Sequence, residues 1–381
     1  MTFAKKNSSR KPNSWLGLGL LGLVAVFLSG CATGTPLDTL QPEGRESKVI
    51  HSLVGPVFIV AGVVMVFVLG AAIYMAWRFR ERSSDDPDVL PEQIHGNNKL
   101  EIGWTVVPTV VLAVIAVFTL VQIFDLEKRD DDALHVLVEG NQWWWQFSYD
   151  LDGDGEYDIV TANEMVIEAG RQADLSITSN DVIHSFWIPR LNGKRDAVPG
   201  RMHTLSLESE KPGYFFGQCT EFCGLSHAEM RMRVIVLPPD EFEQWIQDQL
   251  ADARPAETEA QQRGQEVFEA NCASCHRIRG LETQPSDEKI PLVSNTAPDL
   301  THFASRRVYA GGIFELYDDD GNVDRGQLSA WIRDPKSQKA MAPDEQRGMP
   351  TLGLDEDQIS DVVEYLISTA DGPVWTGPRN D

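Results

Sequence analysis

Positive charge is scarce in this sequence. Its 381 residues include 33 Lys and Arg against 57 Asp and Glu, which gives a formal net charge of −24. The C-terminal region 257–381 alone holds 12 basic and 23 acidic residues. So acidic a chain cannot neutralise phosphates, and the composition excludes nucleic acid as a partner. The acidic C-terminal region could steer a basic electron donor, or serve only to keep an exported domain soluble.

Cysteine is also rare. The chain has 5 cysteines, and four of them, Cys219, Cys223, Cys272 and Cys275, fall in two short motifs that suit metal or haem. The remaining one, Cys31, has no partner, so the sequence predicts no disulfide bond although the domains look exported. Cys31 ends the stretch LSGC after a basic start and a short apolar run, 15–28. We expect a signal peptide with a lipoprotein-type cleavage site before Cys31; the alternative is an uncleaved anchor.

Charge is absent from two long apolar runs, 53–77 and 102–124. Each is long enough to cross a bilayer core of about 30 Å. Arg78, Arg80 and Arg82 follow the first run, and basic residues close to a membrane end favour the cytoplasmic side. The sequence therefore predicts a membrane hairpin whose connecting loop is cytoplasmic, with everything beyond about residue 127 on the outer face.

The stretch CTEFCGLSHAEM places Cys219, Cys223, His227 and Met230 within twelve residues, and His184 lies upstream. Two thiolates, two imidazoles and a thioether form a soft ligand set that suits copper. Two cysteines on one loop can each bridge a pair of copper ions, with one histidine per copper. A closed tetrahedral zinc site is the alternative, but it leaves Met230 unused.

A second motif, CASCH, is a haem attachment signature. Cys272 and Cys275 would form thioether bonds to the porphyrin, and His276 would be the proximal iron ligand. The motif follows an amphipathic pattern, QRGQEVFEANC, and the region closes with DEDQISDVVEYLIS, a capped amphipathic helix. Between the membrane hairpin and this region, residues 133–238 read as many short strands separated by turns, which predicts a β-sandwich.

The copper stretch resembles the binuclear copper (CuA) loop of subunit II of haem-copper cytochrome c oxidases, whose motif reads C-x-E-x-C-x-x-x-H-x-x-M. Cys219, Glu221, Cys223, His227 and Met230 all fit it, and the resemblance covers roughly residues 50–250. It implies that Glu221 ligates copper through its backbone carbonyl. Its carboxylate is then expected to hold a magnesium ion at the contact with subunit I.

The resemblance also assigns two residues outside the loop. In NQWWWQFSY, the first Trp after the Gln is the point where electrons reach copper in the family, which here is Trp143; packing in the core is the alternative. Asn141 stands where the family often has His. Glu101, just before the second apolar run, resembles the family's glutamate at the mouth of a proton channel into subunit I. The alternative is a solvated carboxylate at a helix start.

The C-terminal region resembles a class I cytochrome c domain. Met349, in GMPTLG shortly before the last helix, matches the family's distal haem ligand, and Met341 is the rival.

An acidic stretch in the predicted β-sandwich, 150–158, matches the start of a calcium loop, but position 12 of the loop is Thr161 where a Glu belongs. An acidic hairpin turn is the alternative.

Together these features predict subunit II of a terminal cytochrome c oxidase with a fused cytochrome c. It would pass electrons from cytochrome c through the fused haem and the CuA pair to the oxygen-reducing site of subunit I, with proton pumping. Expected partners are subunit I, subunit III, a cytochrome c donor and membrane lipid, in the bacterial inner membrane. The alternatives are the corresponding subunit of a copper-containing nitric oxide reductase, and a membrane-tethered cytochrome with a structural zinc domain.

The expected fold is a two-helix transmembrane hairpin, a cupredoxin-like β-sandwich and an all-α class I cytochrome c domain. The expected segments are a signal peptide 1–30, an outer segment 31–50, membrane helices 51–78 and 101–126 around the loop 79–100, the copper domain 130–250, a linker 251–262, the cytochrome domain 263–372 and a tail 373–381.

The distal haem ligand can be tested directly. Met349→Ala should abolish the absorption band of the thioether–iron bond and lower the reduction potential of the haem, because a soft axial ligand favours ferrous iron. Met341→Ala is the matched control and should change neither. The reverse pattern would make Met341 the ligand.

Overall fold

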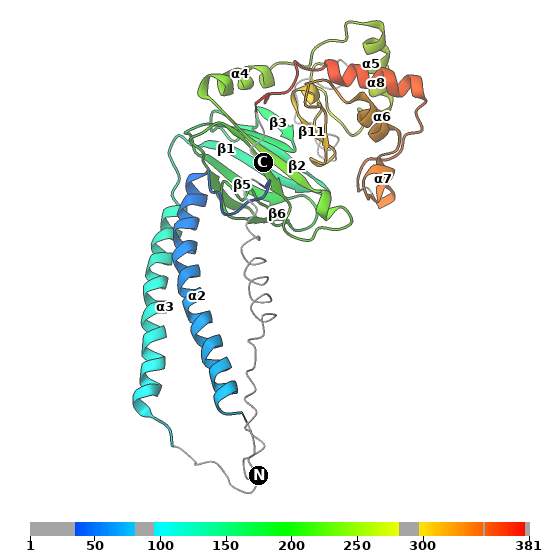
Figure 1. The fold of residues 1–381 in the computed structure, drawn as a ribbon. Coiled ribbons are helices and arrows are strands. Elements are labelled where there is room, and N and C mark those ends of the chain that lie inside the picture. Colours follow the sequence, from blue (N-terminus) through cyan, green and yellow to red (C-terminus); the bar gives the residue numbers. More distant parts are fainter. Residues whose placement is uncertain (1–34, 81–94, 282–296, 346, 378–381) are drawn as a thin grey trace, which may run out of the picture.

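The computed structural model describes residues 35–80, 95–281, 297–345 and 347–377. The expected signal peptide and Cys31 lie outside the described residues. Three units follow one another along the chain: a helical hairpin, a β-sandwich and a mostly helical C-terminal domain (Figure 1).

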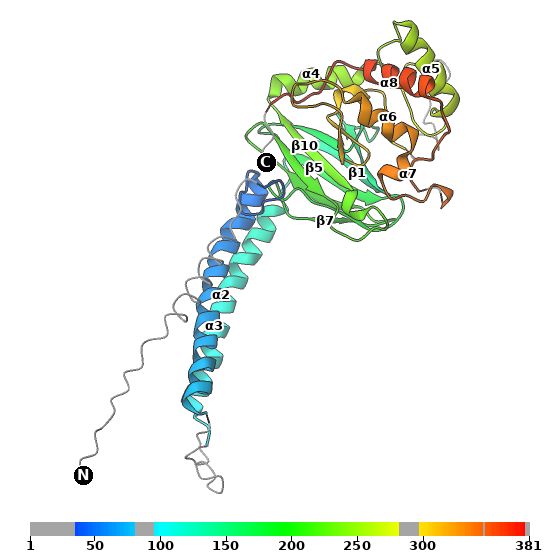
Figure 2. The same cartoon turned by 45° about the vertical axis from the view of Figure 1, so that its right-hand side comes forward.

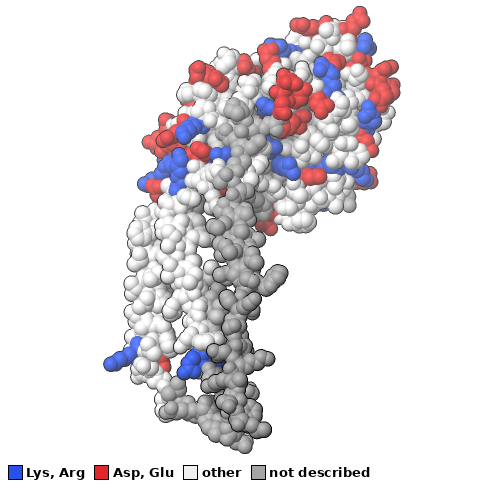
Figure 3. Space-filling view, viewed as in Figure 1, with Lys and Arg blue, Asp and Glu red and all other residues white. Residues whose placement is uncertain are grey.

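The hairpin consists of α2 (Arg45–Arg78) and α3 (Asn98–Leu126), which lie side by side (Figure 2). Both are long and apolar enough to cross a membrane. Their surface is almost free of charge, whereas acidic side chains gather over the two outer domains (Figure 3). Asn97 caps α3 by accepting hydrogen bonds from the amides of Lys99 and Leu100.

Helix α2 starts six residues before the predicted position 51, because its first turn packs on the sandwich. The amide of Ser47 donates to the carbonyl of Leu191, and Ser206 Oγ donates to a Glu46 carboxylate oxygen 3.1 Å away. The apolar run alone could not reveal this turn, since its residues are polar.

The sandwich has one sheet of five strands in the order β3-β2-β1-β5-β8 and one of three in the order β4-β10-β9. β1 runs parallel to β5 and β10 parallel to β4; the other pairs within these two sheets are antiparallel. The strands are β1 (Leu134–Asn141), β2 (Trp144–Asp150), β3 (Ile159–Ala162), β4 (Glu164–Glu168), β5 (Ala173–Ser179), β8 (His203–Leu207), β9 (Gly213–Gln218) and β10 (Arg231–Leu237), with β6 (His184–Phe186) and β7 (Arg195–Ala197) forming a separate pair.

Alternation of side chains builds the core between the sheets. In β5, Ala173, Leu175 and Ile177 are fully buried while the residues between them are partly exposed. Helix α4 (Pro239–Leu250) closes the sandwich with one apolar face, on which Trp245 meets the ring of Tyr149 edge-on at 5.1 Å. The predicted β-sandwich is confirmed.

The C-terminal domain packs α5 (Glu259–Asn271) against α8 (Glu356–Ser368), and both helices start with a capping box. Gly264 permits this close approach, since a Cβ there would collide with the backbone carbonyl of Asp361. The remaining elements are η2 (Phe303–Ser305), β11 (Val308–Tyr309), β12 (Phe314–Glu315), α6 (Arg325–Arg333), α7 (Pro335–Gln338) and η3 (Pro343–Glu345). The small β11–β12 hairpin adds to the predicted all-α domain.

The C-terminal domain rests directly on the sandwich (Figures 1 and 2). One oxygen of the buried Glu164 carboxylate in β4 accepts hydrogen bonds from the amides of Arg307 and Val308, each at 3.0 Å. Arg233 of β10 reaches back and donates to the carbonyl of Gly312 at 3.3 Å. These buried polar contacts fix the orientation of the two domains, because each group would lose its partner if they separated.

Candidate metal centre

Two neighbouring loops of the sandwich carry the predicted copper ligands. His184 begins β6, and the segment 219–230 connects β9 to β10. The amide of Cys219 donates to the carbonyl of Met230 at 2.9 Å, which continues the pairing of the two strands. The first and last ligand candidates of the loop are therefore held next to each other by backbone hydrogen bonding.

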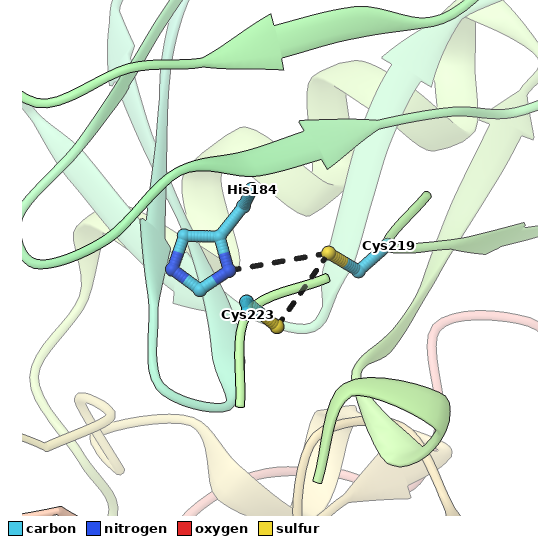
Figure 4. A group of neighbouring side chains, drawn as sticks. All are labelled: His184, Cys219 and Cys223. Carbon is cyan, nitrogen blue, oxygen red and sulfur yellow. Dashed lines mark hydrogen bonds between the residues drawn. The ribbon is translucent and has the colours of Figure 1, made fainter. Parts of the chain in front are cut away.

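The two thiols form the middle of the site (Figure 4). Cys219 Sγ lies 3.8 Å from Cys223 Sγ, too far for a disulfide bond of about 2.05 Å. His184 Nδ1 lies 3.9 Å from the Cys219 sulfur, whereas His227 Nδ1 lies 3.5 Å from the Cys223 sulfur. The arrangement thus has two ends, each with one imidazole, and a shared pair of sulfur atoms between them.

Two further donors lie beside the pair of sulfur atoms. The backbone carbonyl of Glu221 lies 3.3 Å from Cys219 Sγ, and Met230 Sδ lies 3.8 Å from Cys223 Sγ. His184 and Met230 are completely buried, and both cysteines are nearly so. This donor set fits two soft metal ions that share both thiolates. It fits a single tetrahedral zinc less well, since Met230 would be buried against a sulfur atom without a role.

The proton distribution of the two thiols is uneven. The hydrogen bond between the two thiols lowers the pKa of Cys219 far below the ordinary value, to about 4, and the same hydrogen bond, together with burial, raises the pKa of Cys223. Cys219 therefore loses its proton more readily than Cys223. Metal binding would release the proton that remains on a thiol, because both cysteines must be thiolates to bridge two cations.

Asp181 orients the imidazole of His184. Its carboxylate lies 2.7 Å from His184 Nε2, which places the ring proton on that nitrogen and turns the Nδ1 lone pair toward Cys219. Burial would lower the pKa of His184, but the hydrogen bonds with Asp181 and Cys219 outweigh it and raise the pKa. Asp181 lies outside the motifs that identify the ligand candidates, and its position three residues before His184 is the one signal for it in the sequence.

Trp143 is buried against the loop and not open to solvent. Only 4% of it is exposed, and its indole nitrogen donates to the carbonyl of Cys223 at 3.1 Å. Gln142 donates to the same carbonyl at 2.6 Å. Trp143 therefore contacts the backbone of a ligand candidate directly, which suits both the electron-transfer role and the packing role.

The predicted haem motif forms a tight turn at the end of α5. The amide of His276 donates to the carbonyl of Cys272 at 2.9 Å, and its Nδ1 bonds the carbonyl of Pro298 at 2.8 Å. Burial lowers the pKa of His276 and so favours the neutral ring, and because Nδ1 is hydrogen-bonded to Pro298, Nε2 is the nitrogen suited to ligate iron. Met341 is buried within the apolar cluster of the sandwich core, and Met349 is partly buried against that same cluster, so the choice between them as distal haem ligand stays a prediction.

The remaining predicted residues lie apart from the copper loop. Glu101 lies exposed in the first turn of α3, at the end of the hairpin remote from the sandwich (Figure 1). Asp150, Asp152 and Asp158 bring carboxylate oxygens within 4.8 Å of one another. However, all three accept hydrogen bonds from amides of their own turn, as an acidic hairpin turn would, and calcium binding stays untested.

Comparison with protein families matches three parts of the chain in this same order. Residues 44–121 match the transmembrane domain of cytochrome c oxidase subunit II, residues 153–237 match its periplasmic domain, and residues 261–370 match cytochrome c. The predicted order of the three units is therefore confirmed.

Two relatives extend over almost the whole chain. Cytochrome c oxidase subunit 2 of Alkalihalophilus pseudofirmus is 34% identical over 91% of this chain and 95% of its own length. The protein of the same name from Bacillus sp. PS3 is 32% identical over 93% and 97%. Among solved structures, the periplasmic domain of subunit II of cytochrome oxidase from Bradyrhizobium japonicum is 30% identical, covers 32% of this chain and 96% of that one, and has a TM-score of 0.29.

The role of Asp181 leads to a prediction about metal affinity. Asp181→Asn should lower the affinity for copper by roughly 10- to 100-fold, because the orienting carboxylate behind a metal-binding histidine is lost. Competition with a copper chelator measures this on the purified chain. Asp174→Asn is the control, since Asp174 pairs with Arg129 at 2.7 Å in the same outer domain. Equal affinities of both variants would contradict the orienting role.

Proposed function

The chain belongs to the cytochrome c oxidase subunit II family, and on this premise we propose that it is the subunit through which a terminal oxidase of the bacterial inner membrane takes up electrons. The family forms part of an oxidoreductase complex. Membership implies a membrane protein with periplasmic domains, association with subunit I and a cytochrome c donor. The periplasmic domain implies CuA copper, and the cytochrome c domain implies haem.

We assign six residues as the copper ligands. Cys219, Cys223, His184, His227, Met230 and the backbone carbonyl of Glu221 would together hold two copper ions. The observation that carries this assignment is the pair of sulfur atoms 3.8 Å apart, each with its own imidazole within 3.9 Å.

In the C-terminal domain, Cys272 and Cys275 would attach the haem, and His276 and Met349 would be its axial ligands. When bound, haem and copper supply one-electron redox chemistry, so the proposed route runs from a cytochrome c donor through the C-terminal domain and the copper domain to the oxygen-reducing site of subunit I. The residues of this chain bind, orient and shield those groups. They also exclude water, because four of the proposed copper ligands are almost completely buried: His184, Cys219, Cys223 and Met230.

Contact between the two domains supports this route. Trp143 lies beneath the C-terminal domain, whose Lys339 donates to the Trp143 carbonyl at 2.9 Å. A soluble donor therefore finds Trp143 covered, and the acidic C-terminal domain is the part that such a donor can reach. We propose Trp143 as the residue through which electrons pass from that domain into the copper site.

Three finer roles complete the proposal. Glu221 is exposed, as a side chain that binds magnesium at a contact with subunit I would be in the isolated chain. Glu101 lies at the cytoplasmic end of α3, where it could form the mouth of a proton channel into subunit I. Subunit III as a further partner, and proton pumping by the complex, rest on family membership.

A variant without the fused haem tests the route. Cys272→Ala combined with Cys275→Ala should leave the copper spectrum intact but slow copper reduction by cytochrome c by roughly 10²-fold, because the tethered carrier and its high local concentration are lost. Rapid mixing with reduced cytochrome c measures the rate. Ser274→Ala is the control, since it changes only the exposed residue between the cysteines. Unchanged copper reduction in the haem-less variant would mean that electrons bypass the fused haem and arrive at Trp143 directly.

A further inference from the structure

Lys339 directly follows α7 in the C-terminal domain, but the ammonium group of its side chain contacts the copper domain. Only 4% of the residue is exposed. Its ammonium donates three hydrogen bonds, to the carbonyls of Ala310 at 2.8 Å, Trp143 at 2.9 Å and Glu229 at 3.0 Å. An ammonium has three donors, so these three acceptors satisfy it completely.

Burying a charge that is bonded only to neutral carbonyls is costly. If this lysine stabilised only its own domain, we would expect all of its acceptors to be backbone carbonyls of that domain. Two of the three acceptors instead belong to the other domain. The arrangement therefore serves the contact between the domains.

One of the two foreign acceptors, Trp143, contacts the copper loop, and the other, Glu229, lies within it. Trp143 bonds the carbonyl of Cys223 through its indole nitrogen at 3.1 Å. Glu229 directly precedes Met230, which lies 3.8 Å from the Cys223 sulfur. The ammonium thus ties the C-terminal domain to the two backbone segments that flank the proposed ligands, without contacting a ligand itself.

The surrounding backbone is shaped for this contact. Gly311 has a φ of +79°, and a Cβ there would collide with both Lys339 Nζ and the carbonyl of Trp143. The carbonyl of Gly311 also accepts from the amide of Arg231 at 2.8 Å. On the other side of Lys339, Ser226 Oγ donates to the carbonyl of Ala340. The backbones of the two domains therefore approach each other closely around Lys339.

We propose that Lys339 is a positioning residue, which holds the cytochrome domain on the copper loop in the orientation that permits internal electron transfer. The proposal rests on the function proposed above. Because electron tunnelling falls steeply with distance, the tether alone is not enough; the haem must be held against the loop. One electron would then leave the ferrous haem and reduce the oxidised copper pair, with no proton or atom transferred.

Glu164 provides a separate anchor on β4, through the amides of Arg307 and Val308. It holds the domains together but does not touch the loop segments at Trp143 and Glu229. Removing Lys339 should therefore loosen the domain locally, at the copper loop, and leave it attached elsewhere.

The test compares Lys339→Met with Lys336→Met in the full chain within the purified oxidase. Lys336 lies exposed in α7, three residues away, and makes the matched control. The first measurement is hydrogen exchange of the backbone, which needs no redox activity. In Lys339→Met the amide of Arg231 and its neighbours at the loop should exchange faster, while the amides of Arg307 and Val308 stay protected.

The second measurement is the rate of haem-to-copper electron transfer after rapid photoreduction of the haem. Lys339→Met should slow it about tenfold, since losing a hydrogen bond from a charged donor lowers the docked population by at least that factor. The reduction potentials of haem and copper should stay unchanged. Lys336→Met should match the parent in both measurements.

A rate in Lys339→Met equal to the parent's, with both spectra intact, would overturn the proposal while leaving the function standing. Absence of the copper or haem spectrum from the parent would instead overturn the function. If Lys339→Met does not fold, Lys339→Ala replaces it, because it removes the ammonium donors without placing a long apolar side chain among the carbonyls. A folded Lys339→Ala with the parent's rate and exchange pattern would also overturn the proposal.

Discussion

The contact between the sulfur atoms of Cys219 and Cys223 is the feature on which the rest of this molecule depends. Two thiols at 3.8 Å can be kept reduced and close only on a loop whose ends are fixed. The antiparallel strands β9 and β10 fix those ends, and the sandwich core fixes the strands. The imidazoles of His184 and His227 then approach from opposite ends of the pair. The rigid scaffold holds the donors in place, which is what a low-reorganisation electron-transfer site requires.

The C-terminal domain adds a second constraint, since it covers the same loop. Its contacts with the sandwich include backbone carbonyls and amides bonded to buried charged side chains. Glu164 and Arg233 reach from the sandwich, and Lys339 reaches from the C-terminal domain. Such contacts have strict geometry and specify one orientation, whereas a flat apolar contact would allow sliding. The fused domain is thereby placed where it both shields Trp143 and can deliver electrons to the site beside it.

Much of this was predictable because the signals are local. The spacing of Cys219, Cys223, His227 and Met230 identifies the loop, and two uncharged runs identify the membrane hairpin. The order of the three units follows from the same motifs. Contacts between distant segments were not predictable. Nothing near Lys339 in the sequence indicates that it is buried, because its acceptors lie 196, 110 and 29 residues away. Likewise, the first turn of α2 is polar and becomes helix only through its contact with the sandwich.

Electron paramagnetic resonance of the intact, oxidised protein, combined with metal analysis, tests the central claim most directly. Sharing of one unpaired electron between two thiolate-bridged coppers should give a mixed-valence signal with hyperfine splitting from two equivalent nuclei, and two coppers per chain beyond any in subunit I. Cys219→Ser should destroy that signal. A four-line spectrum from a single copper in this chain, or one zinc in place of copper, would contradict the account.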